Sequence, residues 1–500
     1  MSSVPTIRIQ RANERAISKS GDYVLYWMIS SRRLHHNFAL DRALEHCAAL
    51  QKPLVIFEAL RIGYQWANDR IHRFVLDGMA DNALYCQQQG VRYYPYIEPT
   101  PGAGKGLLDA LAANSCAVVT DNFPCFFLPR MVSAAAKRLS VLLESVDSNG
   151  LLPLYATDQV FSRAVDFRRF LQRALPEHLP LVPHADPLAT TKLYPVASLS
   201  RRVTSNWPMV SKALLSGEPG YLNALPIDHA VKPAAEGGGH SQARSRMLDF
   251  LDNKLPGYSG RRNDPDDDVA SGLSPFLHFG HLSVHEVFAE LSCREKWTPG
   301  KLSLRSNGSR EGWWNMSLNA DSFLDELITW REVGYNFSSH REDYDKYASL
   351  PDWVRKTLND HTEDEREHVY TLEQFESGRT RDLLWNAAQM QLVREGRIHN
   401  YLRMLWGKKI LQWTRTPEEA AKIMIHLNNK YGLDGRNPNS YSGIFWVLGR
   451  YDRPWAPIRP IFGSIRYMSS ENTARKVHVK NYLRKYAPEP GAQQQLGLKA

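Results

Sequence analysis

The chain has 500 residues, with 62 lysines and arginines against 53 aspartates and glutamates, a formal net charge of +9. Its composition, 43% hydrophobic and 23% charged, excludes a disordered or fibrous protein, and its length predicts two or more domains. No run approaches the ~20 apolar residues of a membrane span, and the N-terminal segment lacks the apolar stretch of a secretory signal. The five cysteines form no CxxC pair, so we expect neither a disulfide framework nor a metal site. We expect a protein that is not secreted and that lies in the cytoplasm, or in the nucleus if the host is a eukaryote.

The positive surplus is confined to the C-terminal part of the chain. Residues 391–500 carry 19 basic and 7 acidic side chains, whereas residues 1–390 carry 43 and 46. Ten of the 13 tryptophans lie at or beyond Trp297. A basic excess mixed with aromatic side chains is typical of a surface that binds a polyanion, although uneven composition across two domains explains the counts equally well.

The first 175 residues alternate short apolar runs with helical patterns. Strands are predicted at Tyr23–Ile29, Pro53–Leu60, Val91–Glu98, Cys116–Asp121 and Leu151–Thr157. Helices are predicted at about Asn37–Gln51, in a long segment that ends near Gln89, and near Leu107–Ala113. Nearly continuous apolar strands separated by helices indicate a parallel sheet covered by helices. Residues 1–175 are therefore predicted to form a doubly wound, Rossmann-like α/β domain.

The rest of the chain has a different pattern. Residues 176–257 are irregular and rich in proline, with the glycine-rich Glu236–Ser241, and are predicted to connect two domains. Residues 258–490 have apolar residues at helical spacing, as in Asp321–Phe337 and Arg381–Thr414, and are predicted to be all-helical. The polar stretch Thr298–Leu318 is expected to be a surface loop.

Three local patterns are similar to ligand sites, but each has a simpler explanation. Pro101–Gly106, PGAGKG, lacks the residue spacing of a phosphate-binding loop and predicts a turn. The acidic run Asp264–Asp268 is more typical of a solvated segment or of a helix N-terminus than of a cation site. The adjacent His35 and His36 would point to different faces, which disfavours a shared metal.

A helical stripe in the basic part of the chain is the most informative pattern. Its members share one helix face at spacings of three and four residues: His399, Arg403, Trp406, Ile410 and Trp413. A buried arginine needs a carboxylate or a phosphate, and Asp434 is a candidate partner. Trp385 lies 21 residues before Trp406, so a preceding helix could bring the two rings together. By spacing alone, a packed core remains the favoured interpretation.

Several long motifs then identify a family. They are SGLSPFLHFGHLS at Ser271–Ser283, YSGRRNDP at Tyr258–Pro265, the early YWMISSRR, LLWNAAQMQLV…HNYLRMLWGKKILQWT, HLNNKYGLDGRNPNSYSGIFW and RPIFGSIRYM. With these motifs the chain resembles class II cyclobutane pyrimidine dimer (CPD) photolyases, of the photolyase/cryptochrome family, over nearly its whole length. The resemblance implies an antenna-type α/β domain followed by an all-helical domain that binds FAD.

The resemblance also implies cofactor contacts. Ser271, Leu273 and Ser274 match a loop that holds the FAD diphosphate, and Tyr258 matches a further FAD-binding position. Arg403 and Asp434 match an ion pair beside the flavin ring, where a cation stabilises the anionic reduced form. Asn428 matches the residue that faces the redox-active ring nitrogen. A second, antenna chromophore is possible, and a deazaflavin, a folate, FMN or none remain open.

The expected reaction is light-driven repair of DNA. Excited reduced FAD would give one electron to a CPD flipped out of double-stranded, UV-damaged DNA, and the electron would return after the dimer splits. Trp406, Trp385 and Trp413 match a photoreduction relay, with Trp406 nearest the flavin and Tyr370 accessory. Glu326 matches the acid that hydrogen-bonds the dimer. Other positions match contacts to the lesion or to DNA: Arg262, Asn263, Trp330, Met404, Trp446, Arg453, Trp455 and Arg466.

Three departures from the family pattern qualify these expectations. Asn400 stands where class II members usually have glycine, and it could place a polar side chain near the flavin. Ile29–Ser31 replace a usual pair of polar residues, which puts the antenna side in doubt. Gly449–Pro454 are spaced unusually, which weakens the expectation for Arg453. The basic tail is expected to face phosphates, through Arg475, Lys476, Lys480, Arg484 and Lys485.

Two other functions compete with repair by a monomeric photolyase. A cryptochrome-like blue-light photoreceptor would keep FAD and the tryptophans without repairing DNA. The matches at Glu326, Trp330, Met404, Trp446 and Arg466 disfavour it, because a photoreceptor needs no lesion pocket. An FAD enzyme that acts on a small molecule in the dark is disfavoured by the basic surplus.

Overall fold

The structure is a computed structural model that describes residues 4–196, 198–218 and 220–487. The chain folds into two compact units that alternate along the sequence. Unit 1 comprises Met1–Asp158, Gln172–Leu248 and Gly272–Leu302, and unit 2 comprises Gln159–Leu171, Asp249–Ser271 and Ser303–Ala500. The domain boundaries expected from composition, after residues 175 and 257, stay predictions. Residues 1–3, 197, 219 and 488–490 of those domains lie outside the described residues.

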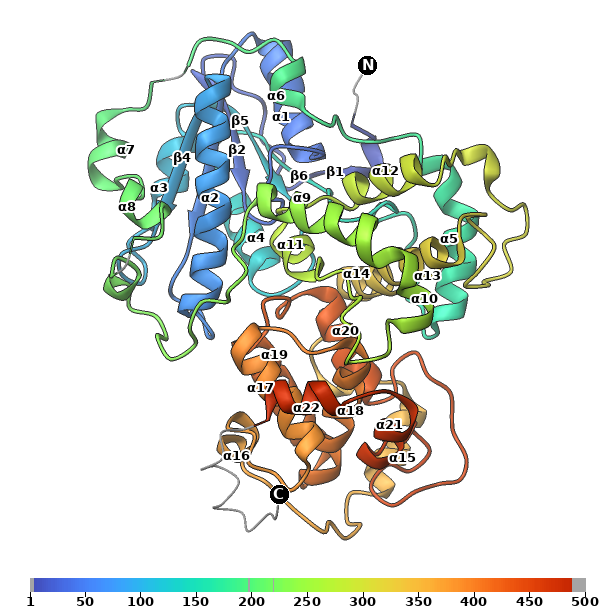
Figure 1. Cartoon of the computed structure of the whole chain (residues 1–500). Helices are drawn as coiled ribbons and strands as arrows, with labels where there is room; N and C mark the ends of the chain where they lie inside the picture. Colours follow the sequence, from blue (N-terminus) through green and yellow to red (C-terminus); the bar gives the residue numbers. More distant parts are fainter. Residues whose placement is uncertain (1–3, 197, 219, 488–500) are drawn as a thin grey trace. The chain divides into compact units, whose positions relative to one another are not determined.

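Unit 1 is built on a six-stranded sheet (Figure 1). Its strands are β1 (Ile9–Arg11), β2 (Tyr23–Met28), β3 (Leu54–Leu60), β4 (Arg92–Ile97), β5 (Ser115–Asp121) and β6 (Leu143–Val146). They lie in the order β1-β6-β5-β2-β3-β4, and every neighbouring pair is parallel except β1 with β6. The central strand β2 places Leu25 opposite Val55 of β3 and Val118 of β5.

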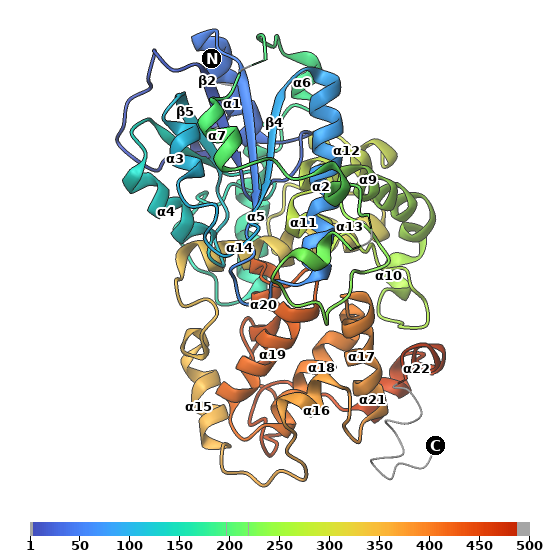
Figure 2. The ribbon, with the colours of Figure 1, turned by 90° about the vertical axis from the view of Figure 1, so that its left-hand side faces the viewer.

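Helices cover both faces of this sheet because successive β2 side chains are apolar on both sides (Figure 2). Val24, Tyr26 and Met28 pack in one core with α1 (Phe38–Leu50) and with Cys86 of α2 (Asp69–Gln89). Tyr23, Leu25 and Trp27 pack in the other core with α3 (Leu107–Ala112), α4 (Leu128–Arg138) and α7 (Arg201–Asn206). The predicted doubly wound α/β fold is confirmed.

Short helices complete unit 1, and one helix links it to unit 2. They are α6 (Pro187–Thr190), α8 (Lys212–Leu215), α9 (His240–Asp249), α11 (Ser274–Phe279) and α12 (Val284–Arg294). Helix α5 (Ala164–His178) begins in unit 2 and ends in unit 1. The turn expected at Pro101–Gly106 is confirmed, with Lys105 N–H donating to the carbonyl of Gly102.

One predicted strand is wrong. Leu151–Thr157 form bends and turns, and the strand at this place in the chain is β6, at Leu143–Val146. The apolar run is buried, but its backbone groups bond to side chains: the carbonyl of Leu151 accepts from Arg8, and Leu154 N–H donates to Asp147. The short β1 strand was missed because only three residues pair, at the antiparallel edge.

Two segments expected to be loose contain buried parts. Within Glu236–Ser241, Gly238 N–H donates to Asp77 of α2, and a Cβ on Gly238 would lie 1.9 Å from the carbonyl oxygen of Phe74. Only glycine allows this approach of the chain to α2. In the predicted surface loop Thr298–Leu318, Trp313 and Trp314 are buried, so the loop is irregular but partly inside unit 2.

Unit 2 is helical, and the part of it that the structure describes contains no strand. Its main helices are α10 (Tyr258–Arg261), α13 (Leu318–Leu324), α14 (Arg331–His340), α15 (Asp352–Asp360), α16 (Leu372–Glu376), α17 (Leu383–Glu395), α18 (Asn400–Trp413), α19 (Pro417–Tyr431), α20 (Pro438–Val447), α21 (Ser470–Lys476) and α22 (Lys480–Tyr486). Two π-helical segments join them, η3 (Phe250–Lys254) and η6 (Asp325–Trp330). The core lies among α17, α18, α19 and α20, with Trp385 and Trp406 among its largest buried side chains.

The acidic run of unit 2 lies at a helix start. Asp266 accepts hydrogen bonds from the backbone N–H groups of Asn481 and Tyr482 in α22, and Asp264 accepts from His478. These donors include first-turn N–H groups of α22, which have no partner within the helix. The run is therefore a capping segment, one of the two interpretations expected from sequence.

Candidate functional site

Of the expected diphosphate loop, Ser271 belongs to unit 2, and Leu273 and Ser274 belong to unit 1. Leu273 precedes α11, whose first residue is Ser274, and Gly272 has a φ of 69° that favours glycine. The guanidinium of Arg246 lies 3.0 Å from where a Cβ on Gly272 would be. Arg246, which pairs with Glu236, thus places a guanidinium beside the loop, and sequence reasoning missed it because α9 showed no motif.

The Arg403–Asp434 pair expected from sequence is present in unit 2. Arg403 Nη2 donates to both carboxylate oxygens of Asp434, each at 3.1 Å. Both side chains are half-buried, so the carboxylate offsets the cost of desolvating the guanidinium. Among the residues described here, Nε and Nη1 of Arg403 donate to no acceptor. These N–H groups are available to a ligand.

Asn428 lies near the same pair. It is buried at the end of α19, and its Nδ2 donates to Ser440 Oγ at 2.6 Å. A Cβ on Gly432 would lie 3.4 Å from Asp434 Oδ1 and 3.6 Å from Asn428 Oδ1, so the two side chains converge beside Gly432. The same Cβ would lie 2.7 Å from the backbone carbonyl oxygen of Asn428, which only glycine avoids. A flavin ring carries both hydrogen-bond acceptors and donors. The free N–H groups of Arg403 can donate to the acceptors, and the amide oxygen of Asn428 can accept from a donor, so these residues fit FAD.

The other cofactor candidates lie at the start of α18 and beside Phe250 and Phe323. His399 precedes α18 and its ring is buried, and burial lowers its pKa to about 4, so it is neutral at pH 7. Asn400 is exposed in the first turn of α18. Tyr258 is buried edge-on against Phe250 and Phe323, and burial raises its pKa to about 12.

The relay candidates form a connected line inside unit 2. Trp406 Nε1 donates to Gln389 Oε1, and Trp385 Nε1 donates to the carbonyl of Trp406, both at 2.9 Å. The rings of Trp385 and Trp413 lie 5.8 Å apart edge to face, and Tyr370 lies 5.3 Å from Trp413. The 21-residue spacing of Trp385 and Trp406 thus corresponds to a contact. Gln389, one turn after Trp385 on α17, was missed because no motif marked it.

Glu326 lies in the π-helical segment η6, between α13 and α14. An extra residue in the helical turn re-aims side chains, and such segments often occur at functional sites. Asp325 anchors the segment through a buried ion pair with Arg168, at 2.7 and 3.0 Å. Glu326 forms an ion pair with Arg262. Burial raises the pKa of Glu326, and Arg262 opposes that rise.

The aromatic candidates next to Glu326 are stacked on each other. The rings of Trp330 and Trp446 lie 4.5 Å apart at 21°. No third ring fits between planes this close, so a flat ligand would contact the outer face or edge of the pair. Met404 is half-buried against the core on α18, and Asn263 is exposed next to Arg262.

A second basic and aromatic cluster includes Trp455. Its ring is 40% exposed, and its Nε1 donates to Asp452. The guanidinium carbons of Arg453 and Arg466 lie 5.5 and 5.6 Å from the ring centroid, within the range of a cation–π contact. Of the basic tail, Lys485 pairs with Glu395, and the other members are exposed.

In unit 1 the chain forms hydrogen bonds to itself at the strand ends where doubly wound sheets usually bind ligands. Such folds bind ligands beyond the strand ends where the strand order reverses, here between β2 and β5. Asp121, at the end of β5, accepts hydrogen bonds from the N–H groups of Ile29, Ser30 and Ser31 at 2.8, 2.8 and 3.0 Å. The residues that depart from the family pattern therefore form an anion-binding turn for the chain's own carboxylate.

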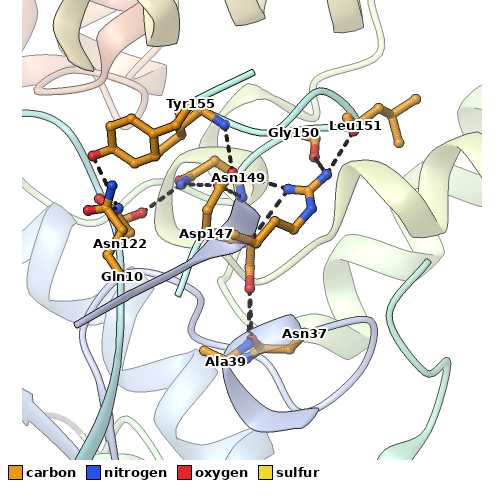
Figure 3. Close-up of polar contacts among 12 residues, drawn as sticks. Gln10, Asn37, Ala39, Asn122, Asp147, Asn149, Gly150, Leu151 and Tyr155 are labelled. Carbon is orange, nitrogen blue, oxygen red and sulfur yellow. Dashed lines mark hydrogen bonds and ion pairs between the residues drawn. The ribbon is translucent and has the colours of Figure 1, made fainter. Parts of the chain in front are cut away.

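A further cleft of unit 1, of about 520 Å3, lies along β1 and α4 and is lined by Gln10, Asn122 and Tyr155. Figure 3 shows these three side chains next to Asp147 and Asn149. Asp147 is fully buried and accepts from Arg8, Asn149 and Leu154, and Arg8 also donates to the carbonyls of Gly150 and Leu151.

Among residues 4–196, 198–218 and 220–487, no group of three His, Cys, Asp or Glu side chains is arranged to hold a metal ion. In the same residues, no helix is long and apolar enough to cross a membrane.

Known proteins are similar to this chain in sequence and in fold. No protein-family model matches the chain. The deoxyribodipyrimidine photo-lyase of Methanothermobacter thermautotrophicus is 33% identical over 482 residues, which cover 95% of this chain and 97% of that protein. A class III photolyase from Agrobacterium tumefaciens superimposes with a TM-score of 0.68 at 18% identity, over 98% of this chain and 94% of that chain. A cryptochrome from Synechocystis sp. superimposes with a TM-score of 0.65 at 15% identity, over 95% and 94%. Identity above 30% along almost the whole of both chains places this protein in the photolyase/cryptochrome family, with the deoxyribodipyrimidine photo-lyases.

Proposed function

We propose that this protein is a class II photolyase that repairs cyclobutane pyrimidine dimers in double-stranded DNA with blue light. The observation that carries the proposal is the cluster of Glu326, Arg262, Trp330 and Trp446 in unit 2. It combines a carboxyl group, a cation and two stacked indoles around one π-helical segment. A photoreceptor without repair activity has no use for this combination.

Each member of the cluster has a part in holding a flipped-out dimer. The indoles offer an outer face to a pyrimidine, a contact worth about 1–3 kcal/mol per base. Glu326, whose pKa burial raises, can donate a hydrogen bond to a carbonyl of the dimer once it is protonated. Arg262 can leave Glu326 for a phosphate or a base edge, which would further favour the protonated acid.

FAD is the proposed cofactor, and when bound and reduced it supplies the light-excited electron that splits the dimer. Arg403, Asp434 and Asn428 would hold the flavin ring, and the positive charge of Arg403 would favour its anionic form. Ser271, Leu273, Ser274 and Arg246 would hold the diphosphate. The line Trp406, Trp385, Trp413 and Tyr370 would carry electrons from the surface of unit 2 to restore the reduced state.

The remaining assignments follow from this activity. An antenna chromophore, if one binds, would occupy the cleft lined by Gln10, Asn122 and Tyr155, which also reaches Asp121 at the end of β5. The protein would act as a monomer where the DNA is, in the cytoplasm of a prokaryote or the nucleus of a eukaryote.

A repair assay tests the proposal directly. The purified protein is loaded with FAD, chemically reduced, and mixed with a duplex that contains one thymine dimer. We expect blue light, and not darkness, to convert the dimer to two thymines, as measured by chromatography of the digested DNA. A protein that binds and reduces FAD but leaves the dimer intact under saturating light would be a photoreceptor instead.

A further inference from the structure

Lys409 lies over the ring of Trp413, the outer tryptophan of the relay line. Its ammonium nitrogen is 5.2 Å from the ring centroid, within the range of a cation–π contact. The side chain belongs to α18, one turn before Trp413, and is buried. Because a buried charge is screened less than an exposed one, the ammonium group acts on the indole at close range.

Asp382 is the carboxylate partner of this lysine. Lys409 Nζ lies 3.4 Å from Asp382 Oδ2. Asp382 is also the N-cap of α17, where its Oδ1 accepts from the backbone N–H of Trp385, and its Oδ2 accepts from the hydroxyl of Ser470. The carboxylate thus holds the ammonium group in place and offsets part of the cost of burying it.

The three relay indoles differ in the surroundings of their N–H groups. Trp406 donates to the side-chain oxygen of Gln389, and Trp385 donates to the backbone carbonyl of Trp406. In the part of the chain that the structure describes, Trp413 Nε1 donates to no acceptor. An indole that loses an electron becomes a radical cation, and an acceptor at its N–H group stabilises the positive charge. Trp413 has a cation over its ring instead, so it is the relay tryptophan least able to hold positive charge.

Tyr370 is the next oxidisable side chain along the line. Its ring lies edge to face with Trp413 at 5.3 Å, and its backbone N–H donates to the carbonyl of Trp413 at 3.2 Å. Its hydroxyl accepts from the backbone N–H of Arg381 and donates to no acceptor among the described residues, so the phenolic proton can pass to water. A phenol that loses an electron and a proton becomes a neutral radical. Such a radical is not destabilised by the charge of Lys409.

We propose that Lys409 is a positioning residue of the relay, whose charge moves the oxidation of Trp413 on to Tyr370. The inference rests on the proposed photoreduction of FAD by this line and adds the residue that decides where the oxidation ends. In the light one electron passes from the line to FAD. Tyr370 then gives one electron to oxidised Trp413 and its phenolic proton to water, and Trp413 is restored. The back reaction would need a proton as well as an electron at Tyr370, so the reduced cofactor would be preserved.

Two variants that break the same ion pair distinguish a charge effect from a structural one. Lys409→Met removes the cation and keeps an unbranched side chain, whereas Asp382→Asn removes the anion and keeps an N-cap oxygen. In full-length protein with FAD bound, transient absorption after a blue flash follows the tryptophan and tyrosine radicals. We expect the tryptophan radical cation to last about tenfold longer in Lys409→Met, with less tyrosine radical. In Asp382→Asn the cation is no longer screened, so the radical cation should be shorter-lived than in the wild type.

Lys430→Met is the matched control. It removes a cation that lies 5.2 Å from the ring centroid of Tyr431 and pairs with Glu376, outside the relay line, and it should leave the radical kinetics unchanged. Changes of the same sign in Lys409→Met and Asp382→Asn would overturn the proposal, because the ion pair would then only hold α17 against α18. A wild-type protein that forms no tyrosine radical would overturn it too. Failure of the proposed function would be seen separately, as absence of dimer repair by chemically reduced protein.

Discussion

The buried charges of unit 1 and the more exposed charges of the candidate site in unit 2 differ in their partners. In unit 1, Asp121 accepts hydrogen bonds from backbone N–H groups and from the Tyr26 hydroxyl, and Asp147 accepts from backbone N–H groups and from Arg8. Arg8 also donates to two backbone carbonyls. In unit 2, Arg403 keeps free N–H groups, and Arg459 and Arg466 have no carboxylate partner among the described residues. Saturated charges stabilise a fold, whereas charges with free donors are available to ligands. We therefore expect substitutions in the first set to change stability and those in the second to change function.

The largest expected effect is on photoreduction. Trp406→Phe replaces the readily oxidised indole that donates to Gln389 and whose backbone carbonyl accepts from Trp385, so light-driven reduction of bound FAD should be nearly abolished. Repair by protein that is chemically reduced beforehand should stay near wild type. Trp313→Phe, at another buried tryptophan of unit 2, is the matched control and should photoreduce normally. Loss of repair by prereduced Trp406→Phe would contradict a role confined to the relay.

A stability effect of similar weight is expected in unit 1. Asp147→Asn leaves Arg8 buried without a counter-charge, which should lower the free energy of unfolding by about 3–5 kcal/mol. Denaturant titration measures the change. Asp109→Asn, which breaks the exposed pair with Arg138, should cost at most about 1 kcal/mol. If the folded Asp147→Asn protein repaired DNA poorly, the network would be more than structural.

The sequence predicted the elements and the site residues of the two units only in part. Apolar runs identified β2 to β5 because a strand buried on both faces needs apolar residues throughout. The run at Leu151–Thr157 has the same composition, yet its backbone bonds to Arg8 and Asp147, and composition cannot show that side chains replace a strand partner. The stripe on α18 and its Trp385 partner were predictable because helical spacing is fixed. Lys409 and Arg246 were not, because their significance arises only when other segments fold beside them.

The next prediction concerns the lesion cluster. Glu326→Ala removes the acid that would donate to the dimer, so the repair quantum yield should fall about 10-fold or more, given about 1.5–3 kcal/mol for a charge-assisted hydrogen bond. DNA affinity should change less, and Glu311→Ala, at an exposed position of unit 2, should change neither. Equal losses of yield and affinity would mean that Glu326 only helps to bind DNA.

The pH dependence of repair adds a second test at this residue. Because burial raises the pKa of Glu326, the protonated, donating fraction should increase as pH falls, and the wild-type yield should rise with it. Glu326→Gln donates through an amide at every pH. It should therefore retain more yield than Glu326→Ala and lose the pH dependence. A glutamine variant with the wild-type pH profile would show that another group titrates.

The smallest expected effect concerns Lys408, a buried lysine that is neither one of the saturated charges of unit 1 nor one of the charges with free donors in unit 2. Lys408 is buried on α18, and burial lowers its pKa to about 7, with Asp452 opposing the shift and Arg466 reinforcing it. Between pH 7 and about 10.5 the unfolded chain binds more protons at this lysine than the folded chain, so this residue's penalty to folding is full below pH 7 and disappears as pH rises to 10.5. Lys408→Met should therefore stabilise the protein, by about 1 kcal/mol or more at pH 7, and the gain should shrink at alkaline pH. Thermal unfolding at pH 7 and pH 9.5 measures this, with exposed Lys422→Met as the control. A stabilisation that does not change with pH would mean that Lys408 is charged in the folded protein and paired with Asp452. Unit 2 would then neutralise this charge with a carboxylate, as unit 1 does for Arg8.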